Sequence, residues 1–295
     1  MRKRISLTWV ITCSIMLQVL NTGAIAQPVA DTVIIPDNSA DTGKVSVHSL
    51  YAGAGYGSNM IYLGTTMSQD NSFGYTSFSY GFRNKLYLTA TGYTINGFSP
   101  FIGFSSLGVS FSHTFNSWFD ISTGLSRYNV AESLRDTLFS NFTYADATLG
   151  IDWRLLYTKI SLGGLFADGG QFYFQTRHSR YFETPSFAGG KAFFSFDPYV
   201  NLIFGSMVTI ETAEGTSTTV SPEYRPWKNN SQGSSSTYTK TFGPMEIDFG
   251  IPIDFSYDFF TIELEPGYVL PLYSDTGTTG MKGFLFMVSA FFRIF

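Results

Sequence analysis

The chain has little cysteine, histidine or charge. Its single cysteine, Cys13, excludes a disulfide within the chain, and no set of cysteines is available for a structural zinc site. Histidine occurs three times and charged residues make up 14% of the 295 residues. Neither metal-ligand spacing nor a glycine loop in the context of a phosphate site is found, so the sequence predicts no cofactor and no metal.

Positive charge is scarcer than negative charge. The formal net charge of the whole chain is −4. Loss of the first 26 residues would remove Arg2, Lys3 and Arg4 but no acid, which would leave −7. An acidic balance without basic clusters disfavours nucleic-acid binding.

Residues 1–26 are typical of a cleaved signal peptide. A basic start at 1–4 precedes an apolar run at 5–20, and Ala24-Ile25-Ala26 is a small-x-small cleavage site. The apolar run is shorter than the roughly 20 residues of a membrane helix. Val10 to Cys13 loosely resembles a lipoprotein cleavage box, which leaves lipidation as the alternative. We expect export through the inner membrane.

Residues 27–43 mix Pro, Asp, Ser and Gly, and we expect a flexible periplasmic leader. Within it, Asp31 to Ile35 resembles the short box by which large outer-membrane receptors engage the energy-coupling protein TonB. Those receptors also carry an N-terminal plug domain, for which this chain has no room.

What the chain does have is aromatic residues, glycine and strict alternation. It contains 30 Phe, 18 Tyr and 29 Gly. From residue 44 onward, apolar and polar residues alternate with period two, which is typical of β-strands with one apolar face. The clearest example is 246–255, where Ile247, Phe249 and Ile251 alternate with acidic residues and glycine.

This pattern predicts an all-β protein: a transmembrane, antiparallel, up-and-down β-barrel spanning residues 44–295. Short turns near Arg83-Asn84, Asn116-Ser117 and Tyr257-Asp258 alternate with longer loops, an asymmetry typical of such barrels. A secreted β-sandwich also alternates and is the competing architecture. About twelve strands are expected, near 45–66, 73–82, 85–95, 101–115, 118–128, 142–153, 157–167, 188–196, 198–210, 242–255, 259–272 and 282–295. Residues 167–190 could hold another strand or an outer loop, so ten or fourteen strands stay open.

Alternation, turn placement and the final Phe295 resemble those of bacterial outer-membrane β-barrel proteins of the porin-like kind. This resemblance implies insertion into outer-membrane lipid by the barrel-assembly machinery, with Phe295 as the assembly signal. Arg293 departs from the pattern and leaves the register of the last strand open. The segment Gly53 to Asn59 is similar to one in uncharacterised barrels from Bacteroidota.

If the apolar faces meet lipid, the opposite faces line the lumen and make it acidic. The predicted lumen acids are Asp120, Asp146, Asp152, Glu246, Asp248, Asp254, Glu263 and Glu265, against the base Lys159. A wall of carboxylates raises the local concentration of cations. The sequence therefore favours a passive pore for ions or small solutes. The alternative is a closed barrel, filled by side chains, with a structural or surface-binding role.

Two further sites can be weighed from the sequence. Tyr224, Arg225 and Trp227 lie in a long polar loop and are candidates for surface recognition or adhesion. His178, in an expected outer loop, is the one candidate for an outer-membrane hydrolase. Its nucleophile and orienting partner cannot be placed, so we expect no enzyme. A hydrophobic-solute channel is a further alternative, suggested by the abundant phenylalanine.

Overall fold

The structure is a computed structural model, and it describes residues 47–62, 65–135, 137–166, 170–211, 217–220, 237–272 and 282–295. The expected signal peptide (1–26) and leader (27–43) lie outside these ranges. So do Tyr224, Arg225 and Trp227.

Almost every described element is a β-strand. Within the described ranges, the only helix is a 3-10 turn, η1, and no helix is long and apolar enough to cross a membrane. The strands are β1 (His48–Gly57), β2 (Ile61–Tyr62), β3 (Thr65–Thr66), β4 (Phe73–Phe82), β5 (Leu86–Ile95), β6 (Phe104–Asn116), β7 (Phe119–Val130), β8 (Phe142–Asp152), β9 (Tyr157–Phe166), β10 (Gln171–Ser179), β11 (Phe182–Glu183), β12 (Ala192–Phe196), β13 (Tyr199–Glu211), β14 (Ser217–Val220), β15 (Thr237–Gly250), β16 (Ile253–Tyr257), β17 (Phe260–Pro271) and β18 (Gly283–Arg293), with η1 at Glu132–Leu134.

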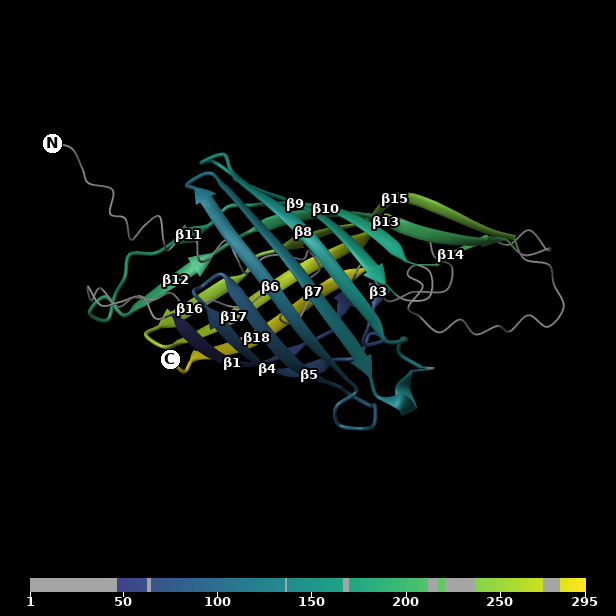
Figure 1. The fold of residues 1–295 in the computed structure, drawn as a ribbon, viewed down its shortest axis with the longest axis horizontal. Helices are drawn as coiled ribbons and strands as arrows, with labels where there is room; N and C mark the ends of the chain where they lie inside the picture. Colours follow the sequence, from purple (N-terminus) through teal and green to yellow (C-terminus); the bar gives the residue numbers. More distant parts are fainter. Residues whose placement is uncertain are drawn as a thin grey trace.

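The strands close into a twelve-stranded antiparallel barrel. Each strand pairs with its sequence neighbour in the wall, and β18 pairs with both β17 and β1, which completes the ring. The wall follows the order β1, β4, β5, β6, β7, β8, β9, β10, β13, β15, β17 and β18 (Figure 1). Closure leaves no open edge in the wall, which is what a β-structure needs in order to span lipid.

The two ends of the barrel differ, and we call them the turn end and the loop end. The turn end carries the C-terminus and the turns after β4, β6, β8 and β16; β11, β12 and β16 lie there (Figure 1). At the opposite, loop end, β13 and β15 extend beyond the other strands (Figure 1). The tight turns have the backbone they require: Arg83 and Asn84 both adopt positive φ, 54° and 50°, as in the hairpin turn of type I′.

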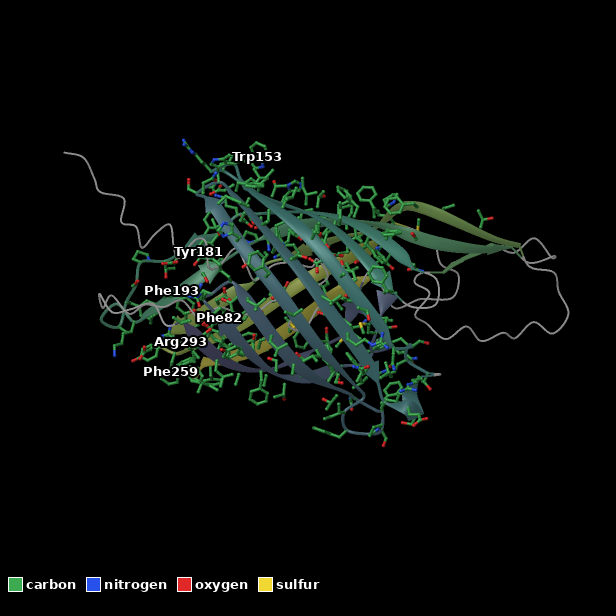
Figure 2. All side chains as sticks on the ribbon, viewed as in Figure 1. Phe82, Trp153, Tyr181, Phe193, Phe259 and Arg293 are labelled. Atoms are coloured by element: carbon green, nitrogen blue, oxygen red, sulfur yellow. The ribbon has the colours of Figure 1, made fainter. Side chains whose placement is uncertain are left out.

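Apolar side chains cover the outside of the wall. The outward positions alternate with less exposed ones along the strands, as Leu88, Val109, Leu125 and Leu149 illustrate, each 40–51% exposed. At the turn end this surface becomes aromatic, with Trp118 among its exposed members. Figure 2 shows Phe82, Trp153 and Phe259 at the same end. An apolar belt bordered by aromatic residues matches a bilayer core and its interface.

The register of the last strand, left open by the sequence, is defined by the structure. Phe284, Phe286, Val288 and Phe292 are exposed on the outside, whereas Phe291 is buried. Arg293 therefore shares the inward face. The carbonyl oxygen of Phe295 accepts a hydrogen bond from the Leu50 amide at 3.1 Å, which ties the chain end to β1. The role of Phe295 as an assembly signal stays a prediction.

The expected strand count is confirmed, but two of the strand assignments are wrong. Residues 188–196 do not form a separate wall strand, because β12 and β13 are one strand interrupted at Asp197-Pro198. The missing strand is β10, within the stretch 167–190, paired with β9 and β13. Proline has no amide hydrogen to donate, and so it breaks the ladder at Pro198 and again at Pro252.

The expected strand at 45–66 is also wrong in extent. β1 ends at Gly57, and the chain then turns into the barrel as the short hairpin β2–β3. Gly57 pairs directly with Phe73 of β4, so the wall is already joined without the intervening residues.

A pair of lysine substitutions in β6 tests the assignment of inside and outside. Val109→Lys places a charge in the apolar belt and should lower the free energy of unfolding by about 2–4 kcal/mol. Ser110→Lys, one residue along and facing the lumen, should lower the free energy of unfolding clearly less. Urea unfolding of both variants in lipid vesicles measures the difference. Equal costs would contradict the assigned faces.

Candidate functional site in the barrel lumen

A row of inward positions, five of them with polar side chains and one a glycine, crosses six neighbouring strands near the turn end. Its members are in direct cross-strand register: Asp120 (β7), Gly150 (β8), Lys159 (β9), Arg177 (β10), Asn201 (β13) and Asp248 (β15). We call these six residues the charged row. Its two cations are adjacent, and a carboxylate lies at each end.

Tyrosine hydroxyls and an asparagine amide donate hydrogen bonds to the carboxylates of this region. The Tyr157 hydroxyl donates to both carboxylate oxygens of Asp120, at 3.3 and 3.1 Å. The Asn201 amide donates to Asp248 Oδ2 at 2.8 Å. Tyr199 donates to Glu265 Oε1 at 2.8 Å. Each contact satisfies an oxygen of a buried or half-buried carboxylate, which limits the cost of removing the charge from water.

The predicted lumen acids lie in different surroundings. Asp120, Glu246 and Asp248 are buried, and Asp254 accepts a hydrogen bond from Ser195 at 2.9 Å. Asp254 and Glu263 are cross-strand neighbours. Asp152 is different, because its Oδ1 accepts the Arg154 amide at 2.6 Å and so caps the β8–β9 turn. Lys159 is buried, as a lumen position requires.

Two charged residues of the lumen were not predicted. Arg177, next to His178 in the stretch where the sequence left a strand or an outer loop open, lies in β10 with only 4% of its surface exposed. Its guanidinium carbon lies 3.6 Å from the ring centroid of Tyr199, in cation–π contact. Asp197, at the break between β12 and β13, is also buried. The alternation of Tyr173, Gln175 and Arg177 with Phe172 and Phe174 was the available signal for an inward Arg177.

His178 lies on the outward side of β10, not in an outer loop. It alternates with the buried Arg177, and its Nδ1 lies 3.0 Å from Thr158 Oγ1. The expected placement at a loop rim is therefore wrong. Because the ring points away from the lumen, it is not positioned to act on a solute inside the barrel.

The loop end of the lumen is occupied by residues 58–62 and 65–72, which we call the plug hairpin. Its side chains at Met60, Ile61, Tyr62 and Met67 are at most 1% exposed. The Asn59 side chain organises the hairpin. Its oxygen accepts from Thr66 and Ser68, each at 2.7 Å, and its amide nitrogen donates to Asp70 at 2.7 Å.

The plug hairpin contacts opposite walls of the barrel. Tyr62 packs against β7 and β8, with ring centroids 5.7 Å from Tyr128 and 5.7 Å from Tyr144. Ile61 shares a buried cluster with Tyr199, Val269 and Leu285, which belong to β13, β17 and β18. Adjacent residues that reach both sides of the ring close the lumen at this level.

The loop between β7 and β8 completes the closure. Leu134, Leu138 and Phe139 are buried in the same apolar cluster as Tyr62. Phe139 lies 5.2 Å from Phe104 in an edge contact. Gln69 of the plug hairpin donates a hydrogen bond to the carbonyl oxygen of Thr137, which joins the two loops. We call the part of the lumen around the plug hairpin the aromatic half. The charged row lies toward the turn end, where rings such as Tyr87 are buried as well.

Across the ranges that the structure covers, no three histidine, cysteine, aspartate or glutamate side chains are grouped so as to hold a metal ion.

Comparison with known proteins gives similarity in architecture only. A scan against protein-family models gave no match, and neither did a search among curated proteins. Among solved structures, the NanC porin covers 83% of this chain and all of its own, with a TM-score of 0.45 and 9% identity. The KdgM porin covers 83% and 98%, with a TM-score of 0.45 and 11% identity. LpxR from Salmonella typhimurium covers 83% and 99%, with a TM-score of 0.42 and 10% identity. At such identities the lumen must be interpreted from this chain's own residues.

Replacing Asn59 tests what holds the plug hairpin in place. Asn59→Leu removes three hydrogen bonds around a buried amide and leaves their partners unsatisfied, each at a cost of about 1–3 kcal/mol. We expect amide hydrogen exchange in 59–70 to accelerate while exchange in β4 stays slow, because the wall is paired independently. Unchanged exchange in 59–70 would contradict the role of Asn59.

Proposed function

We propose that the chain is an outer-membrane channel for small polar solutes or cations, closed at its loop end by the plug hairpin. The outer-membrane location is supported by the closed ladder, the apolar outer surface and the aromatic turn end. The export signal expected in residues 1–26 is consistent with it. The turn end would then face the periplasm, because the short turns of such barrels lie on that side.

The observation that carries the proposal is the charged row beneath an apolar plug. Burying ionic side chains is expensive, and a barrel with only a structural role could fill its interior with apolar residues. Instead, Asp248, Glu265, Asp254 and Glu263 are gathered on neighbouring strands of one side of the wall. Carboxylates outnumber cations among the described lumen residues, which favours entry of cations over anions.

The plug hairpin is suited to act as a gate because the wall does not depend on it. β1 and β4 pair from His48 to Gly57 without help from residues 58–72. The contacts that hold the hairpin are side-chain hydrogen bonds and aromatic packing, all of them reversible. Displacing it would expose the aromatic half of the lumen to solutes from the loop end.

A permanently closed barrel is the second candidate. It is favoured by the near-complete burial of Met60, Ile61 and Tyr62, which is as expected for a fixed core. In that case the protein acts through its outer surface, and the long loop containing Tyr224 and Trp227 becomes the candidate binding element.

Removing the plug hairpin distinguishes the two candidates. Ser58 to Ser72 can be replaced by an Asn-Gly turn, because Gly57 and Phe73 are already cross-strand neighbours. In planar bilayers we expect the unmodified protein to be closed or to open rarely, and the shortened protein to give stable, cation-preferring conductance. A folded but silent shortened protein would refute the channel.

The selectivity has its own matched test in the shortened protein. Asp248→Asn with Glu265→Gln should reduce the cation preference, since both carboxylates lie inside the lumen. Asp258→Asn, in the β16–β17 turn, removes one charge outside the lumen and should leave the preference unchanged. Reversal potentials under a salt gradient measure both effects. An identical cation preference in all variants would show that Asp248 and Glu265 do not select the permeating ion.

A further inference from the structure

One edge of the Arg177 guanidinium has no hydrogen-bond partner. Its Nε and Nη2 atoms are buried and have no hydrogen-bond partner, although the guanidinium plane rests on the Tyr199 ring. These two N–H groups form the side of the guanidinium that binds a carboxylate with two parallel hydrogen bonds. A buried arginine with this edge unsatisfied is unusual, because buried polar groups are normally paired.

The positive charge of Lys159 beside Arg177 also favours an anion at this place in the wall. Lys159 is its direct cross-strand neighbour on β9, and like charges at such positions repel each other. Asp197 interacts electrostatically with both cations. Even so, Asp197 leaves the Nε and Nη2 atoms of Arg177 without a hydrogen bond. A carboxylate placed at this edge would satisfy both donors and reduce the repulsion.

The surroundings require the same ligand to carry a positive group. Asp248 is fully buried, and only its Oδ2 is occupied, by Asn201; Oδ1 has no partner. Asp197 Oδ1 is likewise buried without a partner. Arg177 interacts electrostatically with both of these acids and with Glu265. A simple anion would be repelled by these carboxylates, and a simple cation would leave the arginine edge empty.

We propose that the charged row binds a small zwitterion, an amino acid or short peptide, with its carboxylate on Arg177 and its ammonium group on Asp248 or Asp197. This inference rests on the proposed function, for which it names the solute class. Arg177 lies two residues from the turn end of β10, and Tyr199, on whose ring it rests, shares a buried cluster with Ile61 of the plug hairpin.

Calorimetric titration of the refolded protein in detergent tests the site with three matched probes. Alanyl-alanine carries both charges, its N-acetyl form keeps only the carboxylate, and its amide keeps only the ammonium group. We expect alanyl-alanine to bind saturably and each blocked form to bind about tenfold or more weakly, since each loses charge-assisted hydrogen bonds. L-Alanine extends the comparison to a shorter zwitterion.

Two variants test whether alanyl-alanine binds at the charged row. Arg177→Lys keeps the charge but removes the paired donors, and it should weaken binding of alanyl-alanine about tenfold or more. Arg154→Lys, in the exposed β8–β9 turn, is the matched control and should not change it.

Each other outcome overturns the proposal. Absence of saturable binding by either zwitterion would mean that water alone occupies the row. Equal binding of the N-acetyl form would indicate an anion site, and equal binding of the amide a cation site. Because titration does not require passage, zwitterion binding with no conductance would refute the channel and leave the site intact. Conductance without zwitterion binding would refute the binding site and leave the channel intact.

Discussion

The whole structure depends on closing one ladder of backbone hydrogen bonds. In a bilayer no water is available to an unpaired strand edge, so β18 must find β1 as well as β17. Closure fixes which face of every strand meets lipid and which meets the lumen. The aromatic turn end, the charged row and the plug hairpin all follow from this division, since each occupies a position that closure has made inside or outside.

Closure also creates an interior that has to be filled or hydrated. Near the loop end it is filled: Tyr93 stacks on Phe104 at 4.2 Å, Tyr128 stacks on Phe142 at 4.5 Å, and the plug hairpin takes up the remaining centre. Large inward rings are accommodated by glycine on neighbouring strands. A Cβ at Gly53 would lie 2.7 Å from the Phe291 ring. Near the turn end the wall carries the charged row, at which we propose that the solute binds.

Much of the wall could be predicted from alternation, because lipid and lumen impose opposite polarity on successive residues. β10 was ambiguous because its inward face carries Tyr173 as well as Gln175 and Arg177, which weakens the contrast with the outward Phe172 and Phe174. The plug hairpin could not be predicted. Met60-Ile61-Tyr62 resembles a continuing strand, and whether it turns inward depends on the volume of the closed lumen. The inward side of Asp120 and Asp248 needed only period two, whereas the pairing of Arg177 with Lys159 needed the register.

A reversible lock on the plug hairpin would test the central claim, that this hairpin closes the lumen. Cys13 is the only cysteine in the sequence, so residues 27–295 offer a thiol-free background. Tyr62→Cys and Tyr144→Cys place two thiols where the rings now meet at 5.7 Å. If the hairpin closes the lumen, a short thiol-cleavable cross-link should form between the two cysteines in vesicles. The linked barrel should never conduct, and reduction of the link should permit opening. Efficient linking with conductance unaffected by reduction would contradict it.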